Sequence, residues 1–380
     1  MSGFGSVRRW FSTNGPEILT WTIVAVTWVL SYLSYFRRAG LFFYDSRYYM
    51  AYSFLFGGAS QQEARDRTAE FAAQYHIPMP DAASTFGWGL VQPRVVLPTL
   101  SAPFVDLFGP FGLAVIPAVA TIIFTIIVTR ILMKRYGNLA AVATMVMANA
   151  SVRIVVLMTG MLTESLSALW TLLALLLAWR YIRSPRWTLL LLMAVVTIVS
   201  AFTRQATLIM AGAFVGAWLL GMLTTLRWRS PWMWPAIVVG ATAVIVQVVQ
   251  TALFPFSQTD QFLRMTGTTS LGEALTRVPG LGFHLFVLDV NQFIREDQIL
   301  LLMFFLSVGA LFLFWKREEA HLLFGAMVAI GLYNITNGSA TGFRYAIPGL
   351  VFFLLILAKL FQSTARTLPL RPRDGIPTDA

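Results

Sequence analysis

Long apolar blocks separated by short basic connections constrain this 380-residue chain more than any other feature of it. Of its residues 57% are hydrophobic and only 12% are charged, whereas a soluble chain of this length needs far more polar surface. A helix needs about 20 residues to cross the roughly 30 Å hydrocarbon core of a bilayer, and the blocks are close to that length. The sequence therefore predicts an all-α, polytopic membrane protein.

The blocks predict about ten transmembrane helices within a single transmembrane domain, residues 1–361. The expected spans are residues 18–36, 111–132, 139–158, 165–180, 188–203, 206–223, 232–254, 299–315, 321–337 and 345–361. The first block lacks a small-residue cleavage site and ends in bulky aromatic residues, so we interpret it as a retained helix and not as a signal peptide.

Basic residues in the short connections predict the orientation of the chain. The relevant residues are Lys134, Arg135, Arg180, Arg183 and Arg186. Because short cytoplasmic loops are enriched in Lys and Arg, we expect these connections and both termini to be cytoplasmic. The net charge of +11 mostly reflects this topology, and the chain has no soluble basic face for nucleic acid. We expect a multi-pass protein of the inner (plasma) membrane.

Two long connections, residues 41–110 and 255–298, lie on the outer side in this topology. Long loops in compact domains are more often functional than connecting. In the first loop we expect a short helix over 61–75 and an apolar run over 95–108 that is too short to span and lies at the interface. In the second we expect one or two short helices. Residues 362–380 are expected to form a disordered cytoplasmic tail.

Four ionisable residues lie beside apolar segments, at positions that the topology places near the outer boundary. They are Asp45, Glu164, Arg204 and Arg344. A charged side chain buried in lipid costs a few kcal/mol, so each of them should face protein, water or a ligand. The predicted active site is therefore on the outer face.

Asp45 has two interpretations. It is either a solvated loop acid that pairs with Arg47 or Arg94, or a general base that orients and deprotonates an acceptor hydroxyl. A carboxylate in a partly dry cleft can have its pKa raised toward working pH. The neighbouring aromatic residues Tyr44, Tyr48 and Tyr49 either stack on a sugar or belong to the interfacial aromatic belt.

The remaining charged residues also have a structural and a functional interpretation. Glu164 follows Thr163 and belongs either to a capped helix start or to an acceptor or metal site. Arg204 either extends to the interface from a span end or binds a phosphate. Arg344 and Arg94 are candidate phosphate ligands, because a guanidinium can donate two parallel hydrogen bonds.

Metal binding is not favoured by the composition. The chain has no Cys and three His without metal-ligand spacing, which argues against zinc. Only a divalent cation, Mg²⁺ or Mn²⁺, held by oxygens of Asp45 and Glu164 stays open. Arg47 stands where a second acid would complete an Asp-X-Asp motif, so we assign no metal residue and no certain cofactor.

Five local features occur in a recognisable order along residues 18–361. They are Asp45 just past the first span, Pro93-Arg94 before an apolar run containing Pro98, Thr163-Glu164 in a turn, Arg204 in a Thr-Arg-Gln segment, and Arg344 with Pro348 in Phe-Arg-Tyr-Ala-Ile-Pro. This layout resembles the GT-C superfamily of multi-spanning glycosyltransferases, which use a polyprenyl-phosphate sugar on the outer side of the membrane.

The resemblance implies an inverting hexosyl- or pentosyltransferase whose acceptor is a glycan, a glycolipid or a protein. Asp45 would activate or orient the acceptor, and arginines such as Arg344 would hold the donor phosphate. The missing second acid beside Asp45 departs from the metal-dependent members of the superfamily.

Two other classes of protein compete with this interpretation. A lipid-linked sugar flippase or transporter should carry its ionisable groups near the midplane and show repeat symmetry between its halves. A non-catalytic membrane scaffold could keep the same layout. A test of transfer or hydrolysis with a lipid-phosphate sugar separates the three.

Overall fold

The computed structural model describes residues 3–226, 228–254, 257–337 and 341–367, and these ranges contain helices and turns but no β-strand. The helices are α1 (Gly3–Ala39), α2 (Ser46–Phe56), α3 (Gln61–Ala73), α4 (Ala82–Phe86), α5 (Val96–Phe108), η1 (Gly109–Ala114), α6 (Val115–Tyr136), α7 (Asn138–Ala150), α8 (Val152–Thr159), α9 (Glu164–Arg183), α10 (Trp187–Thr203), α11 (Thr207–Thr225), α12 (Met233–Leu253), α13 (Gln258–Thr266), α14 (Leu271–Glu296), α15 (Gln298–Leu313), α16 (Glu318–Asn337), η2 (Arg344–Gly349) and α17 (Leu350–Thr367). The all-α prediction is confirmed for this part of the chain.

Among the described residues, seven helical segments are long and apolar enough to cross a membrane, and the count becomes eight if the bent pair α7 and α8 is one span. Two further predicted blocks form the shorter apolar helices α10 and α15. Every predicted block is thus helical, but length and composition qualify seven to eight segments as spans and not ten. The polytopic character of the chain follows from the lower count as well.

Apolar side chains on the outside of the bundle explain why the fold belongs in a membrane. On α12 the side chains of Val244, Ile245 and Val248 are 57%, 62% and 63% exposed. A contiguous apolar face of this kind is unfavourable in water, whereas hydrocarbon is a matched solvent for it.

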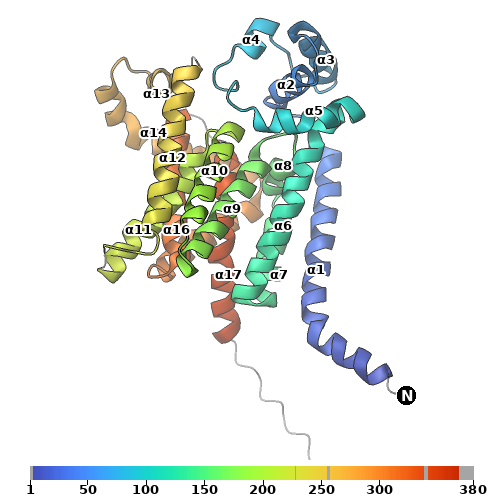
Figure 1. Ribbon diagram of the computed structural model, residues 1–380, viewed down its shortest axis with the longest axis vertical. Coiled ribbons are helices and arrows are strands. Elements are labelled where there is room, and N and C mark those ends of the chain that lie inside the picture. Colours follow the sequence, from blue (N-terminus) through green and yellow to red (C-terminus); the bar gives the residue numbers. More distant parts are fainter. Residues whose placement is uncertain (1–2, 227, 255–256, 338–340, 368–380) are drawn as a thin grey trace, which may run out of the picture.

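The residues between α1 and α6 collect at one end of the bundle (Figure 1). Helices α2, α3, α4 and α5 lie at that end, whereas α1 begins and α17 ends at the opposite end (Figure 1). The two ends of the described chain thus lie at the same end of the bundle. Which side of a membrane they face stays a prediction.

The two long connections have more helix than the sequence suggests. The short helix expected over 61–75 is α3, which starts where the Ser60 hydroxyl accepts a hydrogen bond from Glu63 N (3.2 Å). The second connection contains α13 and α14, and α14 continues for 26 residues through Pro279. The expectation of short helices alone was wrong there.

Two further boundaries can be compared with the expectations. The apolar run over 95–108 is α5, which η1 separates from the long α6. Helix α17 extends to Thr367, so the expected tail does not begin at 362. Residues 368–380 of that tail lie outside the described residues.

Close backbone packing fixes α11 against α16, the two helices that frame the region described below. A Cβ added to Gly216 would lie 2.6 Å from the Cα of Gly325, and one added to Gly212 would lie 2.8 Å from the Gly325 carbonyl oxygen. Small residues at a helix interface allow this approach, which larger side chains would prevent. Helix α11 begins just after Arg204, and α16 ends before the turn that leads to Arg344.

One buried carboxylate organises the 78° bend between α7 and α8. Asp297 accepts hydrogen bonds from the Ser151 hydroxyl (2.7 Å) and from Arg153 N (2.8 Å) with one oxygen. Its other oxygen accepts from Leu300 N (2.9 Å). Asp297 therefore caps the starts of α8 and α15 together, as expected for an acid at helix N-termini.

Candidate functional site

Asp45 lies immediately before α2 and points toward arginines from distant parts of the chain. Its carboxylate accepts a hydrogen bond from Arg344 Nη2 (2.6 Å) and lies 4.0 Å from Arg94 Nη1. It forms no ion pair with Arg47, which donates instead to the Pro78 carbonyl oxygen and to the Tyr48 hydroxyl (3.0 Å). Two arginines were considered as partners of Asp45. The pairing with Arg47 was wrong, and Arg94 does approach Asp45 but at a longer distance than Arg344.

Glu164 is the first residue of α9 and has no exposed surface. Its Oε1 accepts hydrogen bonds from Arg204 Nη1 (2.5 Å) and from Arg344 Nε. The Thr163 hydroxyl makes no capping hydrogen bond, so this part of the capped-turn alternative was wrong, whereas its other part, Glu164 in the first turn of a helix, is confirmed. The Oε2 atom of Glu164 is buried and meets no hydrogen-bonding partner among the described residues.

Arg204 follows α10 directly and is 1% exposed, so the alternative in which it extends to the interface was wrong. Its guanidinium lies over the ring of Tyr345, 5.2 Å from the centroid, in addition to its ion pair with Glu164. A cation over an aromatic face is favourable, most of all where water is excluded.

A strained turn holds Arg344 in place. Gly342 and Phe343 both have positive φ angles, +54° and +76°, and this conformation is uncommon for a bulky residue such as Phe343. Such a residue costs of order 1–3 kcal/mol and persists only where its surroundings hold it. The Phe343 ring packs against Phe293 and Phe353, and Gly342 N donates to Asp289 (2.8 Å).

Arg94 adds a third guanidinium from the outer connection. It is 5% exposed, and its Nη1 donates to the Tyr49 hydroxyl (2.9 Å). We refer to the five residues Asp45, Arg94, Glu164, Arg204 and Arg344 as the charge cluster. The structure brings together all the charged residues that the sequence singled out.

The charge cluster has three guanidinium groups and two carboxylates, which leaves one positive charge in excess. Burial alone would raise the pKa of Asp45, but Arg344, Arg94 and Arg204 outweigh it and hold that pKa below its ordinary value. The Nε atoms of Arg94 and Arg204 are buried, and neither donates to a described residue. Excess positive charge and unused donors suit an anionic group.

The three tyrosines of the 44–49 segment have different surroundings. Tyr44 is 62% exposed, whereas Tyr48 and Tyr49 are buried at 6% and 0%. Tyr48 packs on Trp88, with centroids 4.7 Å apart, and Tyr49 supports Arg94 through its hydroxyl. Of these three rings, Tyr44 is the one open to a ligand.

A cavity of about 310 Å³ opens beside the charge cluster, and we call it the Arg344 cavity. Arg344, Arg153, Glu296 and Thr341 line it on the polar side, where Glu296 is paired with Arg153, and Phe43, Leu157 and Leu162 are among its apolar walls. The Thr341 hydroxyl is buried and makes no hydrogen bond within the described ranges. A ligand that combines an anionic group with apolar surface fits this lining.

The residues present do not fit a divalent cation. Asp45 and Glu164 are the acids nearest to one another in the cluster, and each already faces guanidinium groups that would repel a metal ion. In the described part of the chain, no three His, Cys, Asp or Glu side chains lie close enough together to hold one. The donor set is that of an anion site.

Sequence reasoning missed four residues that shape the site. Tyr345 lies under Arg204, Asp297 fixes the bend before α8, and Arg153 and Thr341 line the Arg344 cavity. Tyr345 directly follows Arg344 in the segment that the sequence singled out, which is a usable signal. Thr341 lies three residues before Arg344, whereas Asp297 and Arg153 are farther from the predicted positions. The roles of these three residues depend on the tertiary fold.

The helices and the charge cluster together define a polytopic helical membrane protein with a buried ionic site at the ends of its helices. No protein-family model matches the chain, and comparison with curated proteins and with solved structures finds no match.

Proposed function

We propose that this protein is a membrane glycosyltransferase that moves a sugar from a polyprenyl-phosphate-linked donor to a glycan, glycolipid or protein acceptor on the outer side of the membrane. The observation that carries the proposal is the double contact of Arg344 with Asp45 and Glu164 at the edge of a cavity with apolar walls. Arg344, which would stabilise the donor phosphate, therefore lies next to the Asp45 carboxylate.

The reaction needs these two groups side by side. The acceptor oxygen forms a bond to the anomeric carbon, and the bond from that carbon to the phosphate oxygen breaks, with its electron pair leaving on the phosphate. The acceptor proton passes to the Asp45 carboxylate. Arg344 and Arg94 stabilise the negative charge that develops on the leaving phosphate.

Donor binding would also change Asp45. In the structure Asp45 is an ionised acid paired with Arg344, and such pairing makes it a weak base. A phosphate that engages Arg344 competes with Asp45 for the guanidinium and removes the charge that lowers its pKa most among the nearby arginines. The carboxylate becomes more basic as the donor arrives.

Glu164 is proposed to align the arginines and the acceptor. Its Oε1 holds Arg204 and Arg344, whereas its buried Oε2 accepts no hydrogen bond from a described residue. Arg204 and Tyr345 keep this carboxylate in position from below. An acceptor hydroxyl that donates to Oε2 would satisfy this atom.

The test is transfer of a radiolabelled sugar from a polyprenyl-phosphate donor by the purified protein in lipid nanodiscs. We expect Asp45→Asn to lose transfer while it stays folded and still binds the donor. The matched control is Asp66→Asn, which neutralises an exposed acid of the same outer connection. Wild-type turnover in Asp45→Asn would remove the assignment.

The same preparation separates the competing classes. A flippase would move the labelled lipid between leaflets without breaking its sugar–phosphate bond, and a scaffold would do neither. Either result, with a donor that binds, contradicts the transferase proposal.

A further inference from the structure

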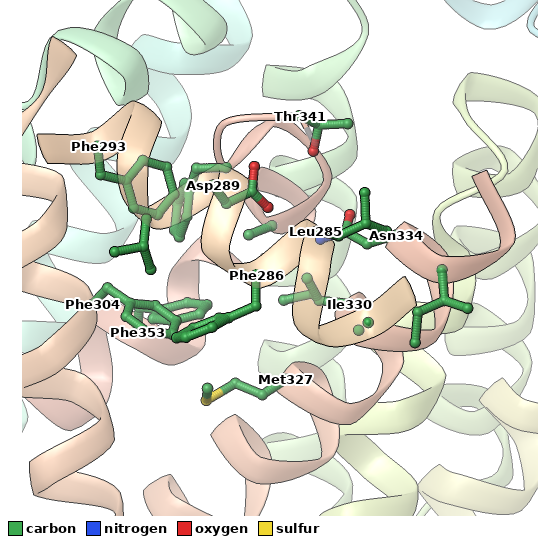
Figure 2. A pocket seen from close by; sticks show the side chains of 16 residues that line it. Leu285, Phe286, Asp289, Phe293, Phe304, Met327, Ile330, Asn334, Thr341 and Phe353 are labelled. Carbon is green, nitrogen blue, oxygen red and sulfur yellow. The ribbon is translucent and has the colours of Figure 1, made fainter. Parts of the chain in front are cut away.

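A second cavity lies between α14, α15, α16 and the start of α17, and we call it the Asp289 cavity (Figure 2). Its volume is about 190 Å³. Most of its lining is apolar, with Phe286, Phe304, Met327 and Phe353 at one end (Figure 2). Phe286 is 46% exposed, so this end reaches the outer surface of the helices.

The opposite end of the Asp289 cavity is polar. Asp289, Asn334 and Thr341 lie there, away from Met327 (Figure 2). Asp289 Oδ1 accepts from Gly342 N (2.8 Å), and burial raises the pKa of this acid. Asn334 Oδ1 and Thr341 Oγ1 are buried, and within the described ranges no hydrogen bond reaches either atom. Buried acceptors of this kind are normally satisfied, so the polar end suits a bound molecule that carries a hydrogen-bond donor.

The gradient of polarity follows the membrane-spanning helix α16. Asn334 and Met327 are seven residues apart on it, which corresponds to about 10 Å along a helix axis. Asn334 is near the end of the span, and Met327 is well inside it. A molecule with one polar end and an apolar chain would lie in the cavity in the direction that a lipid takes.

The charges around the polar end select a neutral head. An anionic head would face the Asp289 carboxylate directly. A cationic head would be repelled by the nearby Arg153: a Cβ added to Gly342 would lie 2.6 Å from Arg153 Nη1, and Gly342 N donates a hydrogen bond to Asp289. A hydroxyl carries no charge and supplies the donor that Asn334 Oδ1 lacks.

We propose that the Asp289 cavity binds the hydroxyl end of a long-chain lipid alcohol, with the hydroxyl between Asn334 and Asp289 and the chain leaving past Phe286. Thr341 lines both this cavity and the Arg344 cavity, so the bound hydroxyl lies next to the charge cluster without belonging to it. The assignment does not depend on sugar transfer, since it concerns binding alone.

The test uses the full-length protein in phosphatidylcholine nanodiscs and two photoreactive probes with the same diazirine-bearing chain. One probe ends in a hydroxyl and the other in a methyl ether, which cannot donate a hydrogen bond. We expect the alcohol to label α14 or α16, identified by mass spectrometry of the peptides, at least tenfold more than the ether does. Equal labelling by the two probes overturns the proposal.

A pair of glycine variants locates the site. A Cβ added to Gly331, which lines the cavity, meets nothing within 4 Å, and the same is true of Gly240 on α12, which does not line it. Gly331→Leu fills the cavity and is expected to reduce labelling at least tenfold, whereas Gly240→Leu leaves it unchanged. Undiminished labelling in a folded Gly331→Leu protein contradicts the assignment.

Competition identifies the source of the hydroxyl. Unlabelled long-chain alcohol and an alkyl glycoside of the same chain length are each added to the alcohol probe. Displacement by the alcohol alone indicates a free lipid alcohol, and displacement by both indicates that a sugar-headed lipid also fits. Carboxylate- and ammonium-ended chains of the same length are added in the same way. No displacement by the alcohol or the glycoside, or stronger displacement by either charged chain, overturns the choice of a neutral hydroxyl.

Discussion

Glu164 and Arg204 form an ion pair at 2.5 Å, although 40 residues separate them and neither side chain is more than 1% exposed. Burying two charges costs several kcal/mol per ion, and their attraction offsets this only when the geometry is good. A buried pair is therefore weak evidence for stability by itself. Its place beside Asp45 and Arg344 gives it a functional reason.

Removing one partner of this pair should destabilise the protein strongly. We expect Glu164→Gln to lower the free energy of unfolding by about 3–5 kcal/mol, because Arg204 and Arg344 lose the carboxylate that compensates them. The control is Glu63→Gln, which breaks an exposed pair with Arg67 and should cost about 0–1 kcal/mol. Reversible unfolding in mixed micelles measures both values. Similar losses in the two variants would contradict a buried cluster.

Arg344→Lys should impair transfer more than it impairs folding. Lysine keeps the charge but cannot reach Asp45 and Glu164 with separate nitrogens, as the guanidinium does. We expect the turnover number to fall about 10²-fold, a typical loss for one stabilising donor. Kinetics with the lipid-phosphate donor measure it, and Arg277→Lys in the exposed pair with Glu273 is the control. If only KM changed, Arg344 would stabilise the bound donor and the transition state equally.

The charge cluster should make stability depend on pH below the ordinary pKa of Asp45, which is about 3.9. Its pKa is lowered in the folded protein, so the unfolded chain takes up the proton first as the pH falls. The stabilisation from Asp45 is therefore complete above that value and is lost as the pH falls through the lower, folded pKa. Melting temperatures of wild type and Asp45→Asn between pH 6 and pH 3 should converge only toward the acidic end. If the two melting temperatures already agreed near pH 6, this would contradict a lowered pKa of Asp45 in the folded protein.

The glycine contact between α11 and α16 should not accept a side chain. In Gly216→Ala the new Cβ would overlap the Gly325 backbone, and overpacking of this kind typically costs about 1–3 kcal/mol. The control, Gly240→Ala, adds the same methyl group in open space on α12. Unfolding in increasing dodecyl sulfate compares them. Equal stability of the two variants would mean that α11 and α16 are not packed at this point.

Sequence alone predicted where the charges lie but not what they touch. All the predicted apolar blocks became helical. Because Glu164 and Arg204 lie at block ends, the sequence also placed both at one depth. Local spacing was misleading for Asp45, because Arg47 is two residues away but is held by the Pro78 carbonyl oxygen. The actual partner, Arg344, is 299 residues away, and only the folded chain brings them together.

Helix lengths were predicted less well where local signals and tertiary packing disagree. Pro279-Gly280 indicates a break, yet α14 continues through it, since the missing proline N–H can be tolerated where neighbouring structure supports the helix. Conversely, Ser151 interrupts an apolar block without any proline, because Asp297 captures its hydroxyl and stabilises a bend. Neither effect is visible from hydrophobicity.

The bridge from Arg344 to both acids has a consequence for how the protein is made. Asp45 and Glu164 are synthesised 299 and 180 residues before their shared arginine. Until Arg344 is made, Glu164 has only Arg204 and Asp45 has only the more distant Arg94 as an ion-pair partner among the described residues. The charge cluster is thus completed only by one of the last segments of the chain, and a stalled chain that ends before Arg344 lacks the residue that links the two acids.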